Sequence, residues 1–261
     1  MITLPVEPAY IDLVNEVCER RDCYIRVEET TFFGRKFLFA YDMKTFASFY
    51  CHVDEYGQRC RWWSQVKEGD VVIDVGAGSG SYVLPALALG AAHVFAFIPE
   101  QHGVDDPSID HLLLSLTANG WRGRCSILPY GLWSEGPGWL NVFSFAPMPE
   151  YTNSKEPPVG GMPVMALDAL IADGLLKMDR IDWMKVDVEG SELGVLTGAS
   201  ETIRRFRPRV QVENPVFKLP DMDARVGAIL EPLGYVAEDR LPYYSVTHTL
   251  WTPREKLEAT A

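Results

Sequence analysis

Four ionisable residues interrupt an otherwise apolar run in the block WMKVDVEGSE at 183–192. Side chains alternate along a strand, so Lys185, Asp187 and Glu189 fall on one face, and Glu192 begins the following helix. Charges on a buried strand are costly unless they gather at its carboxyl end, where open α/β sheets bind ligands. We therefore expect Asp187 or Glu189 to act as a general base; the alternative is an internal Lys–Glu ion pair with a capping acid.

The segment VVIDVGAGSGSY at 71–82 is a second candidate site. An apolar strand ends near Asp74, and glycines from Gly76 and Gly78 onward let the backbone approach a ligand at the start of a helix. The spacing departs from the dinucleotide fingerprint, because Ser81 stands where its last glycine is required. An acid before the glycines suits a ligand with an ammonium group, such as the methionine part of S-adenosylmethionine (SAM). A nucleotide site, or a tight turn without a ligand, are the alternatives.

A third acid, Glu213, ends another apolar strand, RVQVE at 209–213. Carboxylates at two adjacent strand ends suggest a general base or a divalent-metal site. We do not favour a metal, because no histidine or further ligand falls at an obvious spacing. The five cysteines form no C-x-x-C pair and are expected to be buried or free thiols of a reducing compartment.

The elements that position these residues alternate between strand and helix, which predicts a doubly wound, mostly parallel α/β sheet. Strands are expected at 70–76, 93–98, 124–128, 181–188, 209–213, 235–239 and 246–251, and helices at 80–89, 107–118, 167–176, 191–206 and 220–233. Prolines and glycines are dense at 135–163, which predicts loops and edge strands there. We expect this long connection to form part of the acceptor pocket.

The residues before this pattern predict an N-terminal α+β elaboration packed on the core. A helix is expected at 9–21, a hairpin around Gly34-Arg35, and an aromatic, helical segment at 42–66. The sequence therefore predicts two parts, the elaboration at 1–66 and a ligand-binding domain at 67–261.

Composition limits the function classes. Hydrophobic residues make up 47% of the chain, which excludes global disorder. The net charge of −12 disfavours nucleic acid and anionic membranes as partners. The acidic, proline-containing start does not look like a signal peptide, and no apolar stretch is long enough for a bilayer span. We expect a cytoplasmic protein with a small-molecule partner.

Around these motifs the chain resembles the FkbM-type SAM-dependent methyltransferases. The resemblance rests on the glycine turn at 71–82, MALDAL at 165–170, KVDVEGSE at 185–192, VLTGA at 195–199 and the strand that ends at Glu213. It implies a class I methyltransferase sheet of seven strands, SAM as methyl donor, S-adenosylhomocysteine (SAH) as product, and a hydroxyl acceptor on a sugar, polysaccharide or secondary metabolite.

The resemblance also implies roles for single residues. Asp74 and the run Gly76, Ala77 and Gly78 would face the cofactor, and Asp187 and Glu189 would lie beside the transferred methyl group. Lys185, Glu192 and Glu213 remain further site candidates.

Two positions depart from the family pattern. Phe97-Ile98-Pro99 stands where the family has F-E-P, so the ribose-binding acid is missing, and we predict that Glu100 replaces it, with Asp105 or Asp106 as alternatives. Asn214-Pro215 follows Glu213 where a histidine is common. The predicted function is O-methyl transfer; a SAM-binding module without turnover and an N-methyltransferase are the alternatives.

Overall fold

The computed structural model describes residues 25–42, 61–100, 107–141, 150–215, 219–243 and 246–258. The helix predicted at 9–21 and most of the aromatic segment at 42–66 lie outside the described residues. In the part of the chain that is described, no helix is long and apolar enough to cross a membrane.

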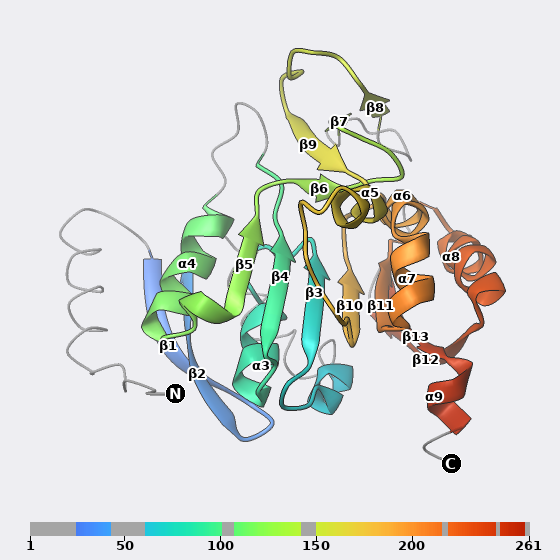
Figure 1. The fold of residues 1–261 in the computed structure, drawn as a ribbon. Coiled ribbons are helices and arrows are strands. Elements are labelled where there is room, and N and C mark those ends of the chain that lie inside the picture. The colour runs from blue at the N-terminus through green and yellow to red at the C-terminus, as the bar shows by residue number, and fades with distance from the viewer. Residues whose placement is uncertain are drawn as a thin grey trace. The chain divides into compact units, whose positions relative to one another are not determined.

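The largest of the sheets has seven strands (Figure 1). Its hydrogen-bonded order is β12 (Tyr235–Tyr243), β13 (Val246–Pro253), β11 (Arg209–Asn214), β10 (Trp183–Val186), β3 (Val71–Val75), β4 (His93–Phe97) and β5 (Cys125–Leu128). β10 pairs in parallel with β3 and β11, whereas β13 runs antiparallel to both of its neighbours. The predicted doubly wound, mostly parallel α/β fold is confirmed.

The helices follow the strands in the predicted alternation. They are α3 (Val83–Leu89), α4 (Ser108–Ala118), α5 (Leu167–Ala172), α6 (Glu192–Gly198), α7 (Ser200–Phe206), α8 (Met222–Leu230) and α9 (Arg254–Glu258), with 3₁₀ turns η2 (Arg61–Gln65), η3 (Arg122–Arg124) and η4 (Glu231–Leu233). The single helix predicted at 191–206 is two helices, because the chain leaves helical geometry at Ala199.

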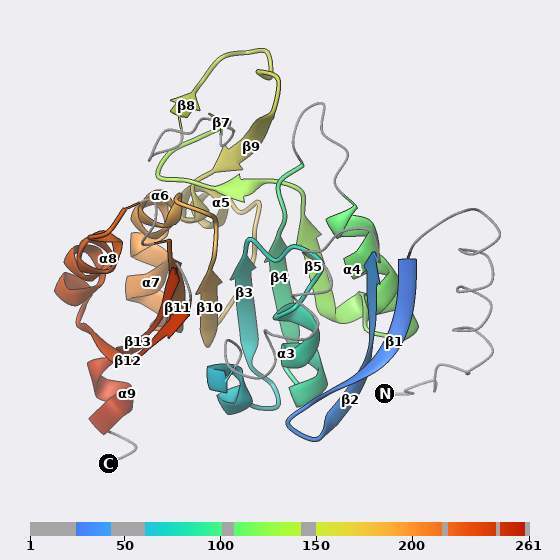
Figure 2. The ribbon, with the colours of Figure 1, turned by 180° about the vertical axis from the view of Figure 1, so that it is seen from behind.

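By internal packing the chain divides into two compact units, of which the first comprises 1–70, 77–96 and 106–127. It contains the predicted hairpin, β1 (Ile25–Phe32) and β2 (Arg35–Asp42), and β2 contacts α3 and α4 (Figure 2). Two side chains of this helical layer bond the backbone of β2. The Ser115 hydroxyl accepts from the Ala40 amide at 2.8 Å, and the Asn119 side chain bonds both the N–H and the C=O of Leu38. The domain boundary at 66/67 stays a prediction.

The second unit comprises 71–76, 97–105 and 128–261. Besides β3, β10, β11, β13 and β12 it contains a small sheet in the order β6 (Gly131–Leu132), β9 (Gly161–Met165), β7 (Gly138–Asn141) and β8 (Glu150–Thr152). In Figure 1 this small sheet is drawn in green to yellow and lies beside α5 and α6.

The small sheet corrects part of the prediction of loops and edge strands at 135–163: β8 is an edge strand, whereas β7 and β9 are inner strands. β9 lies between β6 and β7 although it contains Pro163. The strand tolerates proline because β6 is two residues long and pairs only with Val164 and Met165, so position 163 faces no β6 residue across the ladder. Local composition could not reveal this, since the pairing partners come from separate segments.

Candidate functional site

Lys185 joins two carboxylates at the carboxyl ends of β3 and β10. Its Nζ lies 3.1 Å from Asp187 Oδ2 and 3.6 Å from Asp74 Oδ1. It also donates to the Gly76 carbonyl at 3.5 Å. The Lys185 and Asp74 side chains are buried, whereas Asp187 is 17% exposed. An internal ion pair of Lys185, left open by the sequence as an alternative, is therefore present, but its acids are two aspartates and not the expected glutamate, and Asp187 remains partly exposed.

Glu189 leaves the strand geometry that the alternation assumed. β10 ends at Val186, and Glu189 is an exposed residue with φ +56°. Even so, carboxylate oxygens of Asp187, Glu189 and Glu213 lie within 4.8 Å of one another. The structure thus brings together the acids of two neighbouring strand ends, and such oxygens suit both a proton acceptor and a hard divalent cation.

Glu213 has a buried partner that sequence reasoning missed. His248 Nε2 lies 3.3 Å from Glu213 Oε2, and both side chains are buried. The contact arises from the antiparallel register of β11 and β13, which places His248 opposite Glu213. No local motif signals this residue; only the strand pairing does.

Glu192 holds the turn between β10 and α6. Its Oε1 accepts from the amides of Val188 at 3.2 Å and Gly190 at 3.0 Å. Its Oε2 is buried and has no hydrogen-bond partner among the described residues. Burial raises the pKa of Glu192 to about 7, the Asp187 charge adds to the rise, and the backbone hydrogen bonds oppose it. The predicted capping acid is therefore a buried clamp on the turn that carries Asp187 and Glu189.

Gly76 and Gly78, in the turn that follows β3, have different surroundings. A Cβ at Gly76 would lie 1.8 Å from the Asp187 carbonyl oxygen, so glycine is required there by the close approach of the two strand ends. At Gly78, with φ +50°, a Cβ would meet no described atom within 4 Å. Ala77, between them, is buried. Gly78 therefore leaves room for a ligand, whereas Gly76 serves the packing of β3 against β10.

Glu100 follows β4 as an exposed residue, after the buried Ile98 and the half-buried Pro99. Its binding to a ribose stays a prediction. The alternatives Asp105 and Asp106 lie outside the described residues.

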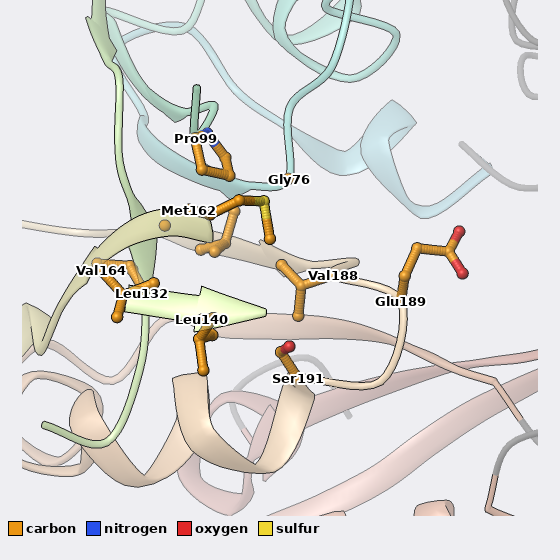
Figure 3. Close-up of a pocket in the computed structure, with 11 residues that line it drawn as sticks. Gly76, Pro99, Leu132, Leu140, Met162, Val164, Val188, Glu189 and Ser191 are labelled. Carbon is orange, nitrogen blue, oxygen red and sulfur yellow. The ribbon is translucent and has the colours of Figure 1, made fainter. Parts of the chain in front are cut away.

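A cavity of about 290 Å³ lies beside Gly76 and the turn after β10, within the second unit. Its lining consists of Val75, Gly76, Pro99, Gly131, Leu132, Leu140, Met162, Val164, Val188, Glu189 and Ser191. Figure 3 shows Glu189 to one side of the apolar side chains, with its carboxylate pointing away from them. The cavity is thus apolar, with its polar side chains confined to the turn after β10.

The glycine turn after β3 and the carboxylates of the site have chemical groups that fit a SAM-type ligand. Open space at Gly78 permits close approach to the backbone, and carboxylates are the groups that bind an ammonium or a vicinal diol. Asp74, however, already faces Lys185, so its contact with the cofactor's ammonium stays a prediction.

A solved structure with a TM-score of 0.50 supports the fold, and two further similar structures have lower scores. Methyltransferase FkbM from Methylobacillus flagellatus KT is 17% identical, with a TM-score of 0.50 over 70% of this chain and 43% of that one. A precorrin-6y C5,15-methyltransferase from Geobacter metallireducens GS-15 is 15% identical (TM-score 0.48; 83% and 95% covered). A T. thermophilus 16S rRNA N2 G1207 methyltransferase, in complex with AdoMet and guanosine, is 14% identical (TM-score 0.46; 88% and 51% covered).

At these identities the likeness concerns the fold alone, and the chain spans less than half the length of the first of these structures. No curated protein matches the sequence. A family model gives the assignment: the methyltransferase FkbM domain matches residues 74–237, from the acid before the glycine turn to beyond Glu213. Because this match covers more than half of the sequence, the chain belongs to the FkbM methyltransferase family.

Proposed function

We propose that the protein is an O-methyltransferase that moves the methyl group of SAM to a hydroxyl of a small molecule. Membership of the family supports SAM-dependent methyl transfer in general. The observation that carries the narrower proposal is the cluster of carboxylates from Asp187, Glu189 and Glu213, whose oxygens lie within 4.8 Å of one another. A hydroxyl must lose its proton during methyl transfer, and a carboxylate at this edge can accept it.

The cofactor, when bound, supplies a methyl group on a sulfonium with a good leaving group. In the proposed arrangement the backbone at Gly76, Ala77 and Gly78 holds its methionine part, with Asp74 near the ammonium. Glu100 binds the ribose hydroxyls. The protein's main contribution is then alignment of the hydroxyl with the methyl group, a term worth up to about 7–11 kcal/mol.

Asp187 is the proposed proton acceptor. It pairs with Lys185 at 3.1 Å, yet remains partly exposed, so it can meet an acceptor while its charge is balanced. Glu189, on the exposed turn, orients the acceptor hydroxyl. Glu213, backed by His248, completes the acidic edge. No metal is needed for this assignment, although the three carboxylates would suit one.

Calorimetry with SAH tests the cofactor site. If Asp74 contacts the ammonium, Asp74→Asn should weaken SAH binding by the roughly 1.5–3 kcal/mol of a charged hydrogen bond. Equal affinities of wild type and variant would remove Asp74 from the site, and no binding by either would contradict the cofactor assignment. Conversion of SAM to SAH with hydroxylated acceptors then distinguishes an enzyme from a SAM-binding module without turnover.

A further inference from the structure

We infer that the cavity under the small sheet binds the apolar body of the methyl acceptor, so that the acceptor is a compact hydroxyl compound with an apolar body rather than a saccharide or a nucleobase. This inference rests on the proposed O-methyl transfer and names the substrate class of the same site.

The chemistry of the lining carries the inference. The small sheet contributes Leu132, Leu140, Met162 and Val164, and none of these side chains offers a hydrogen-bonding nitrogen or oxygen. On the side of the central sheet the lining continues with Val75, Val188 and Pro99, which are equally apolar. Glu189 and Ser191 are the lining residues with polar side chains.

This lining discriminates between acceptor classes. A sugar or a nucleobase placed in the cavity would surrender hydrogen bonds to water from several groups and regain few from the walls. An aliphatic or aromatic body loses no such bonds and gains from the removal of apolar surface from water. The cavity therefore favours an acceptor whose polar groups are few and lie at one end.

The polar groups of the lining also set the orientation. Glu189 and Ser191 both belong to the turn after β10, next to Asp187. Figure 3 shows the Glu189 carboxylate directed away from the apolar side chains. An acceptor with its body in the cavity would thus present its hydroxyl at this rim, where the three carboxylates gather. At about 290 Å³, the cavity lies just below the usual range of ligand pockets, roughly 300–1,000 Å³, so it suits a compact ligand.

The competing occupant is the adenine of the cofactor, because Gly76 and Pro99 also line the cavity. Calorimetry separates the two occupants when SAH and an acceptor probe are measured independently. We choose 2-naphthol as the apolar probe, and methyl α-glucoside and guanosine as polar probes, each titrated into protein saturated with SAH.

Met162, which is half-buried, lines the cavity from β9. Met162→Trp should fill the cavity, and Met162→Gln should make this part of its lining polar with little change in volume. Val159→Trp is the matched control, since Val159 is 86% exposed between β8 and β9 and does not line the cavity. Thermal unfolding checks that each variant is folded.

We expect 2-naphthol to bind, and both Met162 variants to weaken it about tenfold or more, equivalent to ~1.4 kcal/mol. SAH affinity should stay unchanged in all three variants, and Val159→Trp should bind 2-naphthol like the wild type. Equal or tighter binding of methyl α-glucoside or guanosine would overturn the inference. Loss of SAH binding in the folded Met162 variants would do so too, by assigning the cavity to the adenine. SAH binding by the wild type without 2-naphthol binding contradicts this inference alone, whereas absence of SAH binding contradicts the proposed function.

Discussion

Charge at the site converges on Lys185, which is buried between Asp74 and Asp187. Removing one member of a buried ion pair lowers the free energy of unfolding, because the remaining charge is left without a partner in the protein interior. Asp187 differs from Asp74 in being partly exposed, and its loss leaves Lys185 paired with the buried Asp74 at 3.6 Å, so we expect a smaller stability cost for Asp187→Asn. This difference allows chemistry and stability to be separated by substitution.

Asp187→Asn and Glu189→Gln should reduce methyl transfer about 10²-fold or more, the usual scale for losing a general base. Unfolding free energy should stay nearly unchanged, since neither side chain is fully buried. Glu201→Gln, an exposed acid on α7, is the control for the loss of one charge. A stability loss of about 3–5 kcal/mol with turnover per folded molecule preserved would instead mark a structural ion cluster.

Glu192 should make stability depend on pH in a direction opposite to that of a salt-bridged acid. Its folded pKa of about 7 exceeds the ordinary 4.5, so the folded state binds the proton more tightly than the unfolded state. The stabilising contribution is complete below pH 4.5 and is lost as pH rises through about 7. At ~1.4 kcal/mol per pKa unit, the change is on the order of 3 kcal/mol.

Glu192→Gln imitates the protonated form and keeps an oxygen for the amides of Val188 and Gly190. Urea unfolding from pH 5 to 8 should show that the variant gains stability over the wild type as pH rises. The control Glu201→Gln should leave the wild-type pH profile intact. Parallel curves for the wild type and Glu192→Gln would contradict the raised pKa.

Among the elements, α6 packs closely against the segment that follows β6 of the small sheet. A Cβ at Gly194 would come within 2.0 Å of Trp133 Cε3, and one at Gly198 within 2.0 Å of the Trp133 carbonyl oxygen. Trp133 directly follows β6 and packs with Leu140 and Val164 of the small sheet. The absence of a side chain at Gly194 and Gly198 thus leaves room for Trp133. Trp133 in turn packs against Leu140 and Val164, which line the cavity.

Gly194→Ala should therefore destabilise the protein by about 1–3 kcal/mol or more through overpacking. Alanine is intrinsically the better helix former by up to ~1 kcal/mol, so any loss of stability reflects the contact with Trp133. Gly123→Ala is the control, because a Cβ there meets nothing within 4 Å. Urea midpoints that are unchanged in Gly194→Ala would show that Trp133 moves aside freely.

On the scale of the whole molecule, the net charge of −12 bears on the class of substrate. RNA binding draws most of its affinity from Lys and Arg contacts to phosphates and falls with salt. Fluorescence anisotropy of labelled single-stranded and duplex RNA at about 50 mM salt should therefore show no saturable binding. Saturable binding that weakens as salt is added would contradict the proposal of a small-molecule acceptor.

The sequence by itself determined the alternation of strands and helices, because buried parallel strands such as VVIDV and WMKV are mostly apolar runs, each with one charged residue, bounded by turn residues. It also placed Asp187 and Glu213 at neighbouring strand ends, since carboxyl ends of parallel strands share one edge. The family resemblance followed from local motifs, and the comparison with the family confirmed it.

Only the tertiary structure decided which charges meet. Lys185 faces Asp74 because β10 and β3 pair in one register, and His248 faces Glu213 because β13 runs antiparallel to β11. The inner position of β9 and the place of Trp133 against α6 depend likewise on segments that are distant along the chain. Periodicity reports which face of its own element a residue occupies, whereas a contact depends on the register between two elements, and that register is set by packing the whole sheet.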